Sequence, residues 1–235
     1  MNPIKQIAGT VNKVRDLSPT AREYTIRPDN PFPFVAGTFV NLFVTHEGEV
    51  IRRAFSISSN DDNNLEFTLS IRLSPDGKLT PIMWSKNMIG EKVKIMGPLG
   101  LNTVDRIQSN KIFLFGFGIG AGVVKSLAEH IVNNRQELES LTIVTGNRSA
   151  SEILHKDFFD NLAEKNEKVS VKYVVSDKKE PHGHPTGYIQ EHINTYDFND
   201  SDIYICGQSI ACVDLEEKIK LTKPRNSHFL IEDFH

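Results

Sequence analysis

Cysteine is scarce in this sequence of 235 residues, which contains only Cys206 and Cys212. Two thiols cannot supply a four-cysteine zinc or iron–sulfur site, and they cannot build a disulfide scaffold. Apolar runs are also short, and none approaches the roughly 20 residues that a membrane-spanning helix needs. Residues 1–14 lack the apolar core of a secretory signal. We therefore predict a reduced, cytoplasmic protein that does not associate with membranes.

An excess of charge of one sign is also missing, because the formal net charge is only −3. Nonspecific binding to nucleic acid is therefore not expected. His182 and His184 share a proline-rich loop, but two ligands rarely suffice for a metal site, so we predict none. With 39% hydrophobic and 24% charged residues, the composition is that of an ordinary globular protein. The length fits two domains of roughly 100–130 residues each.

The first hundred residues follow the pattern of β-structure. Apolar and polar residues alternate strictly over residues 65–73, as in a half-buried strand. Residues 39–44 and 93–96 are predicted to form further short strands, and clusters of proline and glycine separate these segments. This arrangement favours a small antiparallel β-barrel or sandwich over residues 1–104.

The remaining residues, 105–235, follow a different pattern, in which buried strands alternate with helices. The apolar run at residues 112–115 is typical of a parallel strand that is buried on both faces. Further strands are predicted at 141–144, 169–175 and 203–206, and helices at 123–132, 153–162, 187–193 and 213–221. Alternating strands and helices predict a parallel sheet with right-handed crossovers, as in a Rossmann-like α/β domain.

Charge divides along the same boundary. Residues 1–104 hold 12 Lys and Arg against 10 Asp and Glu, whereas residues 105–235 hold 15 against 20. The first half is thus net positive and the second net negative. Two explanations of this division are about equally good. One is chance, and the other is that an acidic partner docks on the first half.

Two segments of the first half have the composition of a ligand site. Arg53, Ala54, Phe55 and Ser56 combine a fork for phosphate oxygens, a ring that can stack and a directed hydroxyl. A strand end with solvated arginines is the alternative interpretation. In the segment Gly77-Lys78-Leu79-Thr80, Thr80 is a good helix N-cap, so free N–H groups would face an anion. An ordinary junction between a loop and a helix has the same sequence requirements.

The order of these motifs resembles the flavin domain of the ferredoxin–NADP reductase superfamily, in particular the bacterial ferredoxin/flavodoxin–NAD(P) reductases. The resemblance is carried by AGTFVNLFV, RRAFSISS, NNLEFTLSIRLSPDGKLTPIM and GEKVKIMGPLG. It implies a β-barrel that holds FAD, with Arg53 on the pyrophosphate, Phe55 packed on the isoalloxazine and Ser56 facing its N5 region. It further implies that Gly77, Lys78, Leu79 and Thr80 contact the phosphates. The strand residues Ser70, Ile71 and Arg72 would lie along the flavin.

The second half begins with a glycine-rich turn between a predicted strand and a predicted helix. Gly116, Phe117, Gly118 and Gly120 occupy the position at which a dinucleotide pyrophosphate approaches a helix N-terminus. A tight turn that binds nothing would need only one or two glycines. In the resembled family, a threonine stands where this chain has Phe117, so a bulky ring is expected where nicotinamide would lie.

The last predicted strand leads into Cys206 and Gly207, which match the cysteine–glycine pair of the resembled family. There the cysteine shapes the contact between nicotinamide and flavin, and a plain buried core thiol is the alternative for Cys206. The chain ends in an acidic and aromatic run like that of the resembled reductases. By that resemblance, Glu232 lies near the flavin, and Phe234 and His235 fold back towards it. A frayed terminus is the alternative interpretation.

Specificity for the adenosine end is expected from the loops of the second half. Arg148 matches a family arginine that can meet a ribose phosphate. Asp177 would repel a 2′-phosphate and could accept hydrogen bonds from ribose hydroxyls. The two residues argue in opposite directions, and the balance favours NADH over NADPH.

The resemblance implies an FAD-dependent reductase that transfers hydride between NAD(P)H and flavin. Ser56, Cys206 and Glu232 would serve the reaction, and electrons would pass to ferredoxin, flavodoxin or another small carrier protein. Two alternatives remain open. One is a flavoprotein electron-transfer subunit or sensor with weakened nicotinamide binding, which Phe117 favours. The other is a binding module without flavin.

Overall fold

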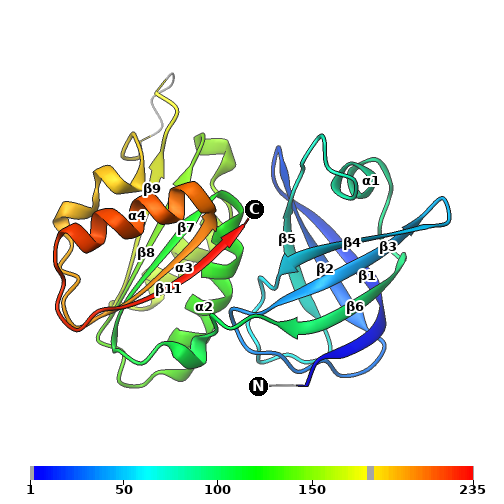
Figure 1. Ribbon diagram of the computed structural model, residues 1–235, viewed down its shortest axis with the longest axis horizontal. Helices are drawn as coiled ribbons and strands as arrows, with labels where there is room; N and C mark the ends of the chain where they lie inside the picture. Colours follow the sequence, from blue (N-terminus) through cyan, green and yellow to red (C-terminus); the bar gives the residue numbers. More distant parts are fainter. Residues whose placement is uncertain (1–2, 179–182, 235) are drawn as a thin grey trace.

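The computed structural model describes residues 3–178 and 183–234, in which two sheets lie side by side (Figure 1). The first sheet has six strands in the order β4-β3-β6-β1-β2-β5. Neighbouring strands are antiparallel. An isolated antiparallel bridge between Ile57 and Leu69 joins the two edges and draws the sheet into a barrel. The strands and the one helix of this half are β1 (Lys5–Ser18), β2 (Ala21–Pro28), β3 (Phe39–His46), β4 (Glu49–Ser56), β5 (Phe67–Arg72), α1 (Thr80–Ser85) and β6 (Lys92–Leu99).

The predicted barrel is confirmed, with two local corrections. The alternating strand begins at Phe67 and not at Leu65, whose side chain is 60% exposed. The strand predicted at residues 93–96 is longer, because β6 continues to Leu99 and includes the cis Gly97–Pro98 peptide. Both corrections follow from pairing, because strand ends are set by hydrogen-bonded neighbours as well as by local composition.

The second sheet has five parallel strands in the order β11-β10-β7-β8-β9. This order, with a helix or 3-10 turns in each connection between successive strands, confirms the predicted Rossmann-like arrangement. Residues 187–193 form two short 3-10 turns, Ile189–Glu191 and Ile193–Thr195, where a helix was predicted. The strands and helices are β7 (Lys111–Phe117), α2 (Ala121–Asn134), β8 (Ser140–Asn147), α3 (Lys156–Lys165), β9 (Val169–Val175), β10 (Asp202–Gln208), α4 (Ser209–Leu221) and β11 (His228–Phe234).

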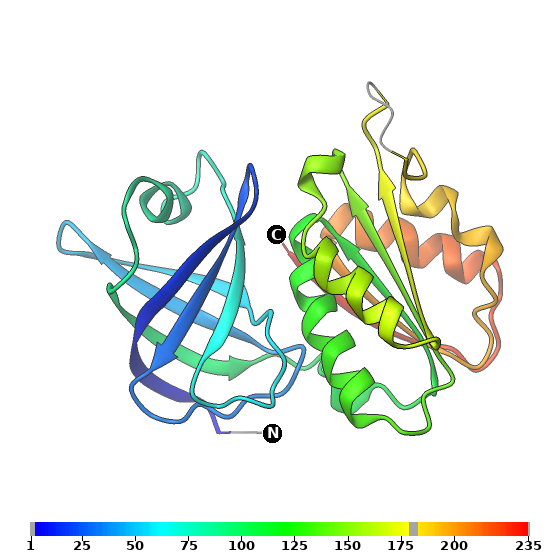
Figure 2. The same ribbon diagram turned by 180° about the vertical axis from the view of Figure 1, so that it is seen from behind.

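Both faces of the parallel sheet are covered by helices. In β7, Ile112 and Leu114 face the core beneath α2 and α3, whereas Phe113 and Phe115 face the core beneath α4. Successive side chains of a strand point to opposite faces, so a continuous apolar run serves two cores. Figure 2 shows α2 and α3 over one face, and Figure 1 shows α4 over the other. None of the helices in the described ranges is long and apolar enough to cross a membrane.

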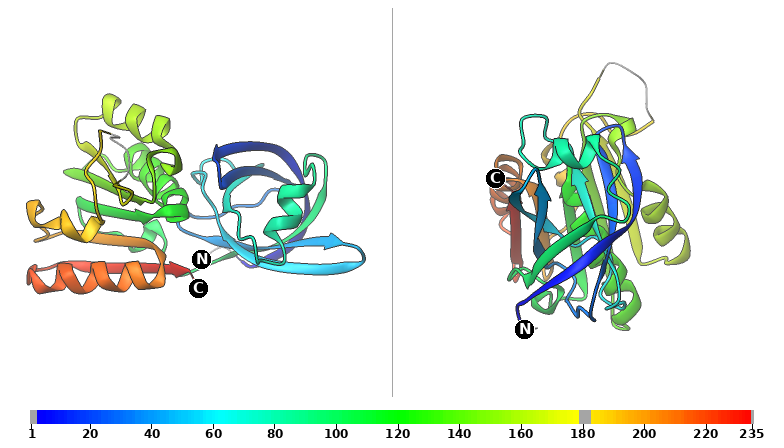
Figure 3. Two further views of the ribbon diagram at one scale, coloured as in Figure 1. Left: turned by 90° about the horizontal axis from the view of Figure 1, so that it is seen from above. Right: turned by 90° about the vertical axis from the view of Figure 1, so that its right-hand side faces the viewer.

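Helix α2 joins the two halves. Ser126 Oγ donates to the Ser59 carbonyl at 2.6 Å, and His130 Nδ1 lies 2.6 Å from Asp61 Oδ1. Gly122 allows a close approach, because a Cβ there would lie 2.9 Å from the Cβ of Ser70. Strand β11 ends at the same boundary (Figure 3). The division of the chain near residue 104 remains a prediction.

Candidate functional site

A cavity of about 370 Å³ lies where the barrel meets the second half. It brings together strands β4 and β5, the start of α2 and the end of β11, which are far apart in the sequence. Its walls are formed by Phe39, Ala54, Phe55, Ser56, Ser70, Ile71, Arg72, Ile119, Gly122, Val123, Glu232, Asp233 and Phe234. The structure thus places eight of the predicted site residues around one space, namely Ala54, Phe55, Ser56, Ser70, Ile71, Arg72, Glu232 and Phe234.

The lining of this first cavity suits a flat aromatic ligand. The rings of Phe39, Phe55 and Phe234 come from three different strands, and Arg72 adds a cation. Flat rings stack on aromatic side chains, and a guanidinium binds anionic or carbonyl oxygens. The isoalloxazine ring of a flavin combines these properties, so the residues present fit the group.

Arg72 is held in place by groups from both halves. Its Nη1 donates to Thr20 Oγ1 at 2.8 Å and lies 3.0 Å from Glu152 Oε2. The same carboxylate oxygen accepts hydrogen bonds from the hydroxyls of Ser18 and Thr20. Charge-assisted hydrogen bonds of this kind fix geometry more firmly than neutral ones. Because Arg72 is fixed, its position between the halves is defined before any ligand arrives.

Glu232 faces the first cavity from β11. Burial raises the pKa of its carboxyl, the nearby charge of Asp233 adds to the rise, and a hydrogen bond from Asn102 opposes it. Asn102 Nδ2 donates to Glu232 Oε2 at 3.1 Å and to the carbonyl of Ile231 at 2.6 Å. A raised pKa makes Glu232 a better proton carrier near neutral pH than an exposed glutamate. Its catalytic role remains a prediction.

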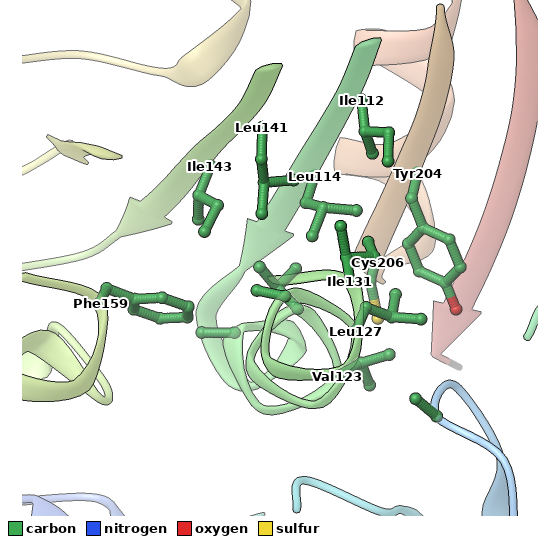
Figure 4. Packing of buried hydrophobic residues seen from close by; sticks show 14 of the residues in the cluster. Ile112, Leu114, Val123, Leu127, Ile131, Leu141, Ile143, Phe159, Tyr204 and Cys206 are labelled. Atoms are coloured by element: carbon green, nitrogen blue, oxygen red, sulfur yellow. The ribbon is translucent and has the colours of Figure 1, made fainter. Parts of the chain in front are cut away.

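Cys206 lies in the core of the second half and lines neither cavity. Its side chain packs beneath α2 with Leu127 and Ile131 (Figure 4). Burial is the main reason that the pKa of its thiol is well above the usual value. The backbone at Cys206 is paired with Glu232 in the sheet, so it supports the cavity wall indirectly. The predicted catalytic role of Cys206 has no support from this placement.

The predicted phosphate-binding residues lie outside the first cavity. Arg53 is exposed, and its Nη1 donates to the Arg52 carbonyl at 2.7 Å. Leu79 is buried in the barrel core and stands at the N-cap of α1, so the prediction that Thr80 is the N-cap was wrong. The Thr80 hydroxyl is instead bonded to the backbone of Ser74. Phosphate binding by Arg53 and by residues 77–80 remains a prediction.

A second cavity, of about 440 Å³, lies at the carboxyl ends of the parallel strands. Three of the predicted site residues line it near these strand ends. Two, Phe117 and Gly118, belong to the glycine-rich turn, and the third, Arg148, follows β8. Arg72, Ile119 and Phe234 line both cavities, so the two spaces adjoin. The full lining is Arg72, Phe117, Gly118, Ile119, Gly146, Asn147, Arg148, Ser176, Gly187, Tyr188, Ile189, Gln190, Gln208, Ala211 and Phe234.

Two glycines of the predicted dinucleotide site, Gly120 and Gly207, have a packing role, and their contact with a dinucleotide remains a prediction. A Cβ at Gly120 would overlap the carbonyl of Cys206. A Cβ at Gly207 would lie 2.6 Å from the Cβ of Phe117, and Gly207 has a φ of 148°. These glycines therefore let the turns after β7 and β10 pack together. Gly116, Gly120, Gly207 and Asp177 do not line the second cavity, and His235 lies outside the described residues.

Sequence reasoning missed two polar residues of the second cavity. Asn147 and Gln190 are buried, and their oxygens Oδ1 and Oε1 have no hydrogen-bond partner within the described ranges. A buried acceptor without a donor is costly, so each amide would be stabilised if its oxygen turned towards an O–H or N–H group of a ligand in the cavity. The ribose hydroxyls and amide groups of a nicotinamide dinucleotide meet this need. Asn147 could have been predicted from its position at the carboxyl end of a parallel strand, because ligands of such sheets bind there.

Comparisons with known proteins agree with this geometry. The family described as "Oxidoreductase FAD-binding domain" matches residues 8–103, and "Oxidoreductase NAD-binding domain" matches residues 114–214. The chain belongs to the ferredoxin–NADP reductase superfamily. It carries the FAD-binding domain of this superfamily followed by the NAD-binding domain, as the two cavities lead one to expect.

Individual relatives within the superfamily are distant. The reductase component of phenol 2-monooxygenase from Pseudomonas sp. strain CF600 is 30% identical over 162 residues, which cover 69% of this chain and 45% of that protein. NADH-cytochrome b5 reductase 1 of Candida albicans is 24% identical over 176 residues, which cover 73% of this chain and 60% of that protein. The chain thus spans only about half the length of such relatives.

Solved structures share the fold over the whole chain. The Amycolatopsis cytochrome P450 reductase GcoB superposes with a TM-score of 0.87 at 22% identity, covering 100% of this chain and 72% of that one. A ferredoxin NADP+ reductase from Neisseria gonorrhoeae, solved with FAD and NADP, gives a TM-score of 0.82 at 16% identity, covering 98% and 99%. At these identities the likeness establishes the fold alone.

Proposed function

We propose that this chain is an FAD-dependent reductase that takes electrons from a nicotinamide dinucleotide and passes them to a separate protein. In this proposal, residues 1–104 hold FAD in the first cavity and residues 105–235 hold the dinucleotide in the second. Bound flavin would supply the redox chemistry, since it can exchange electrons in pairs or singly. The chain's own residues would bind and orient the two ligands.

The adjoining walls of the two cavities carry the proposal. Arg72, Ile119 and Phe234 belong to both, so ligands that fill both spaces would meet at these side chains. Transfer between two ligands requires the reacting atoms to come within about 3–3.5 Å of each other. Phe234 stands at this meeting point, and its ring must share the space with the incoming nicotinamide or leave it.

The nature of the dinucleotide follows from the lining of the second cavity. The unpaired oxygens of Asn147 and Gln190 are acceptors, so they suit hydroxyl and amide donors and disfavour the additional 2′-phosphate that distinguishes NADPH from NADH. Arg148 lines the same cavity and favours phosphate. The acceptors are buried and Arg148 is exposed, so we propose NADH as the preferred donor.

The electron acceptor is proposed to be a one-electron carrier protein, such as a ferredoxin or flavodoxin, or an oxygenase component. Several relatives are named as reductase components of monooxygenases, among them the phenol 2-monooxygenase component. The two cysteines of this chain cannot hold an iron–sulfur cluster, so such a cluster would belong to another protein or chain segment. The net positive charge of the first half suits an acidic carrier.

An anaerobic titration of the purified protein tests the proposal. The protein should be yellow, and stoichiometric NADH should bleach the flavin absorption rapidly, with NADPH slower. Yellow protein that neither nucleotide bleaches would support the alternative of a flavoprotein with weakened nicotinamide binding. Colourless protein that does not take up added FAD would refute both.

A further inference from the structure

A histidine of the second half is buried against the wall of the first cavity. His155 directly precedes α3 and has a φ of 56°, in the left-handed region. Its side chain has no exposed surface, and its Nε2 lies 2.9 Å from Ser70 Oγ. Ser70 belongs to β5 of the barrel and lines the first cavity. The contact therefore joins the two halves at the proposed flavin site.

The imidazole of His155 is neutral. Burial, with smaller effects from the charges of Lys125 and Arg15, lowers the pKa of His155 to about 3. At neutral pH, one ring nitrogen therefore carries a hydrogen and the other is an acceptor. The direction of the hydrogen bond to Ser70 depends on which nitrogen is protonated.

Glu23 determines which ring nitrogen of His155 carries the hydrogen. His155 Nδ1 has no hydrogen-bond partner within residues 3–178 and 183–234, and Glu23 Oε2 is the carboxylate oxygen 3.9 Å away. An N–H that faces a carboxylate is attracted to it, whereas a bare lone pair is repelled. Arg15 holds Glu23 in place at 2.8 Å. The proton therefore lies on Nδ1, and Nε2 accepts the hydrogen bond from the Ser70 hydroxyl.

We propose that His155 is a positioning residue for the flavin cavity, because it engages the hydroxyl hydrogen of Ser70 and leaves the Ser70 oxygen as an acceptor towards the cofactor. The inference rests on the proposed function, since it concerns the flavin that this cavity would hold. The group opposite Ser70 must then carry an N–H or O–H, as the flavin ring and its ribityl chain both do.

The same segment holds a second residue that contacts the wall of the first cavity. Glu152, three residues before His155, pairs with Arg72, two residues after Ser70 on β5. Arg148, four residues earlier still, lines the second cavity. Residues 148–155 thus line the second cavity through Arg148, and through His155 and Glu152 they hold two wall residues of the first cavity, Ser70 and Arg72, from the nucleotide-binding half.

Substitutions of His155 and Ser70 in the FAD-loaded protein test the proposal. His155→Phe and Ser70→Ala should each shift the visible absorption bands and the reduction potential of bound FAD, and weaken FAD binding about tenfold. His155→Gln should restore most of the wild-type spectrum, because its amide oxygen can accept the Ser70 hydrogen. The double variant His155→Phe/Ser70→Ala should be no worse than either single variant, since both remove the same interaction.

His130→Phe is the matched control. His130 also joins the halves, through Asp61, but it lines neither cavity. It should leave the flavin spectrum and potential unchanged. An equal shift in this variant, additive effects in the double variant, or a shift with Ser70→Ala alone would overturn the positioning role. Wild-type protein that binds no FAD would overturn the proposed function as well. If FAD binds but its affinity, spectrum and potential are unchanged in His155→Phe, only this inference is overturned.

Discussion

Among single residues, Arg53 is the one member of the predicted motif Arg53-Ala54-Phe55-Ser56 that does not line the first cavity. Its guanidinium is exposed on β4, next to the wall residues Ala54 and Phe55. A pyrophosphate that extends from the cavity along this strand would meet it. Arg53→Ala should therefore weaken FAD binding by about 2 kcal/mol, or about 30-fold, measured by flavin fluorescence. Arg52→Ala removes the same charge one position away and should change the affinity less than about threefold; equal losses would contradict the assignment.

The Phe117 ring limits the space in the second cavity that nicotinamide can occupy. The ring lines the second cavity, and the missing side chains of Gly146 and Gly207 leave space for it. Phe117→Thr should speed flavin reduction by NADH about tenfold, because small displacements of the reacting atoms are costly. FAD affinity should not change. Stopped-flow reduction measures the rate, and an equal or slower rate would mean that the Phe117 ring does not limit access.

Residues that carry a distinctive motif could be predicted from the sequence, and residues that act through burial could not. Phe55, Ser56 and Arg72 were predicted because their order along the chain resembles a family pattern, and the structure places all three in one wall. Asn147 and Gln190 were missed because amide side chains are usually exposed. His155 was missed because its partner, Ser70, lies 85 residues earlier in the chain.

At the scale of helices and strands, the approach of α2 to β5 depends on Gly122. A Cβ at this position would lie 2.9 Å from the Cβ and Oγ of Ser70 and 3.2 Å from the Cβ of Ser58. Gly122→Ala should therefore push the helix away from the barrel and lower the free energy of unfolding by about 1–3 kcal/mol in urea titrations. Asn134→Ala, at the exposed end of α2, removes only a hydrogen bond to the His130 carbonyl of the same helix and should change it by less than about 0.5 kcal/mol. Equal stability of the two variants would show that the contact relaxes without cost.

The apolar pattern predicted one strand of the parallel sheet with its observed bounds. Val169–Val175 was predicted with the bounds of β9, because apolar residues stand at both ends of that strand and recur between them. Strands β1 and β2 were not predicted. Most of β1 is exposed or half-buried, and its backbone pairing with β2 and β6 holds it in the barrel. Helix α3 begins three residues later than predicted, since His155 has a positive φ that ends the preceding turn.

For the whole molecule, the pair formed by His130 and Asp61 makes the contact between the halves depend on pH. The hydrogen bond to Asp61 raises the pKa of His130 above 6.5 against the effect of burial. Burial opposes ionisation of Asp61, but hydrogen bonds from His130 and the Ala36 N–H outweigh it and lower the pKa below 3.8. The stabilisation from His130 is complete below pH 6.5 and is lost as the pH rises through the raised value. That from Asp61 is complete above pH 3.8 and is lost as the pH falls through the lowered value.

We therefore expect the melting temperature to fall as the pH rises from about 6 to 9. The loss should correspond to about 1 kcal/mol from this pair. Scanning calorimetry across this range measures it. His130→Gln keeps a hydrogen-bond donor but cannot titrate, so its melting temperature should change less with pH. A variant with the same pH dependence as the wild type would assign the effect to other groups.

The placement of the two cysteines gives the molecule a built-in reporter of unfolding. Cys206 and Cys212 are both fully buried in the second half, and burial raises the pKa of Cys212 to about 12. Reagents that attack thiolates should therefore label neither residue until that half opens. The barrel contains no cysteine, so the labelling rate would time the opening of the parallel sheet alone. Comparison with the rate at which flavin is released would then tell whether the halves come apart together or in sequence.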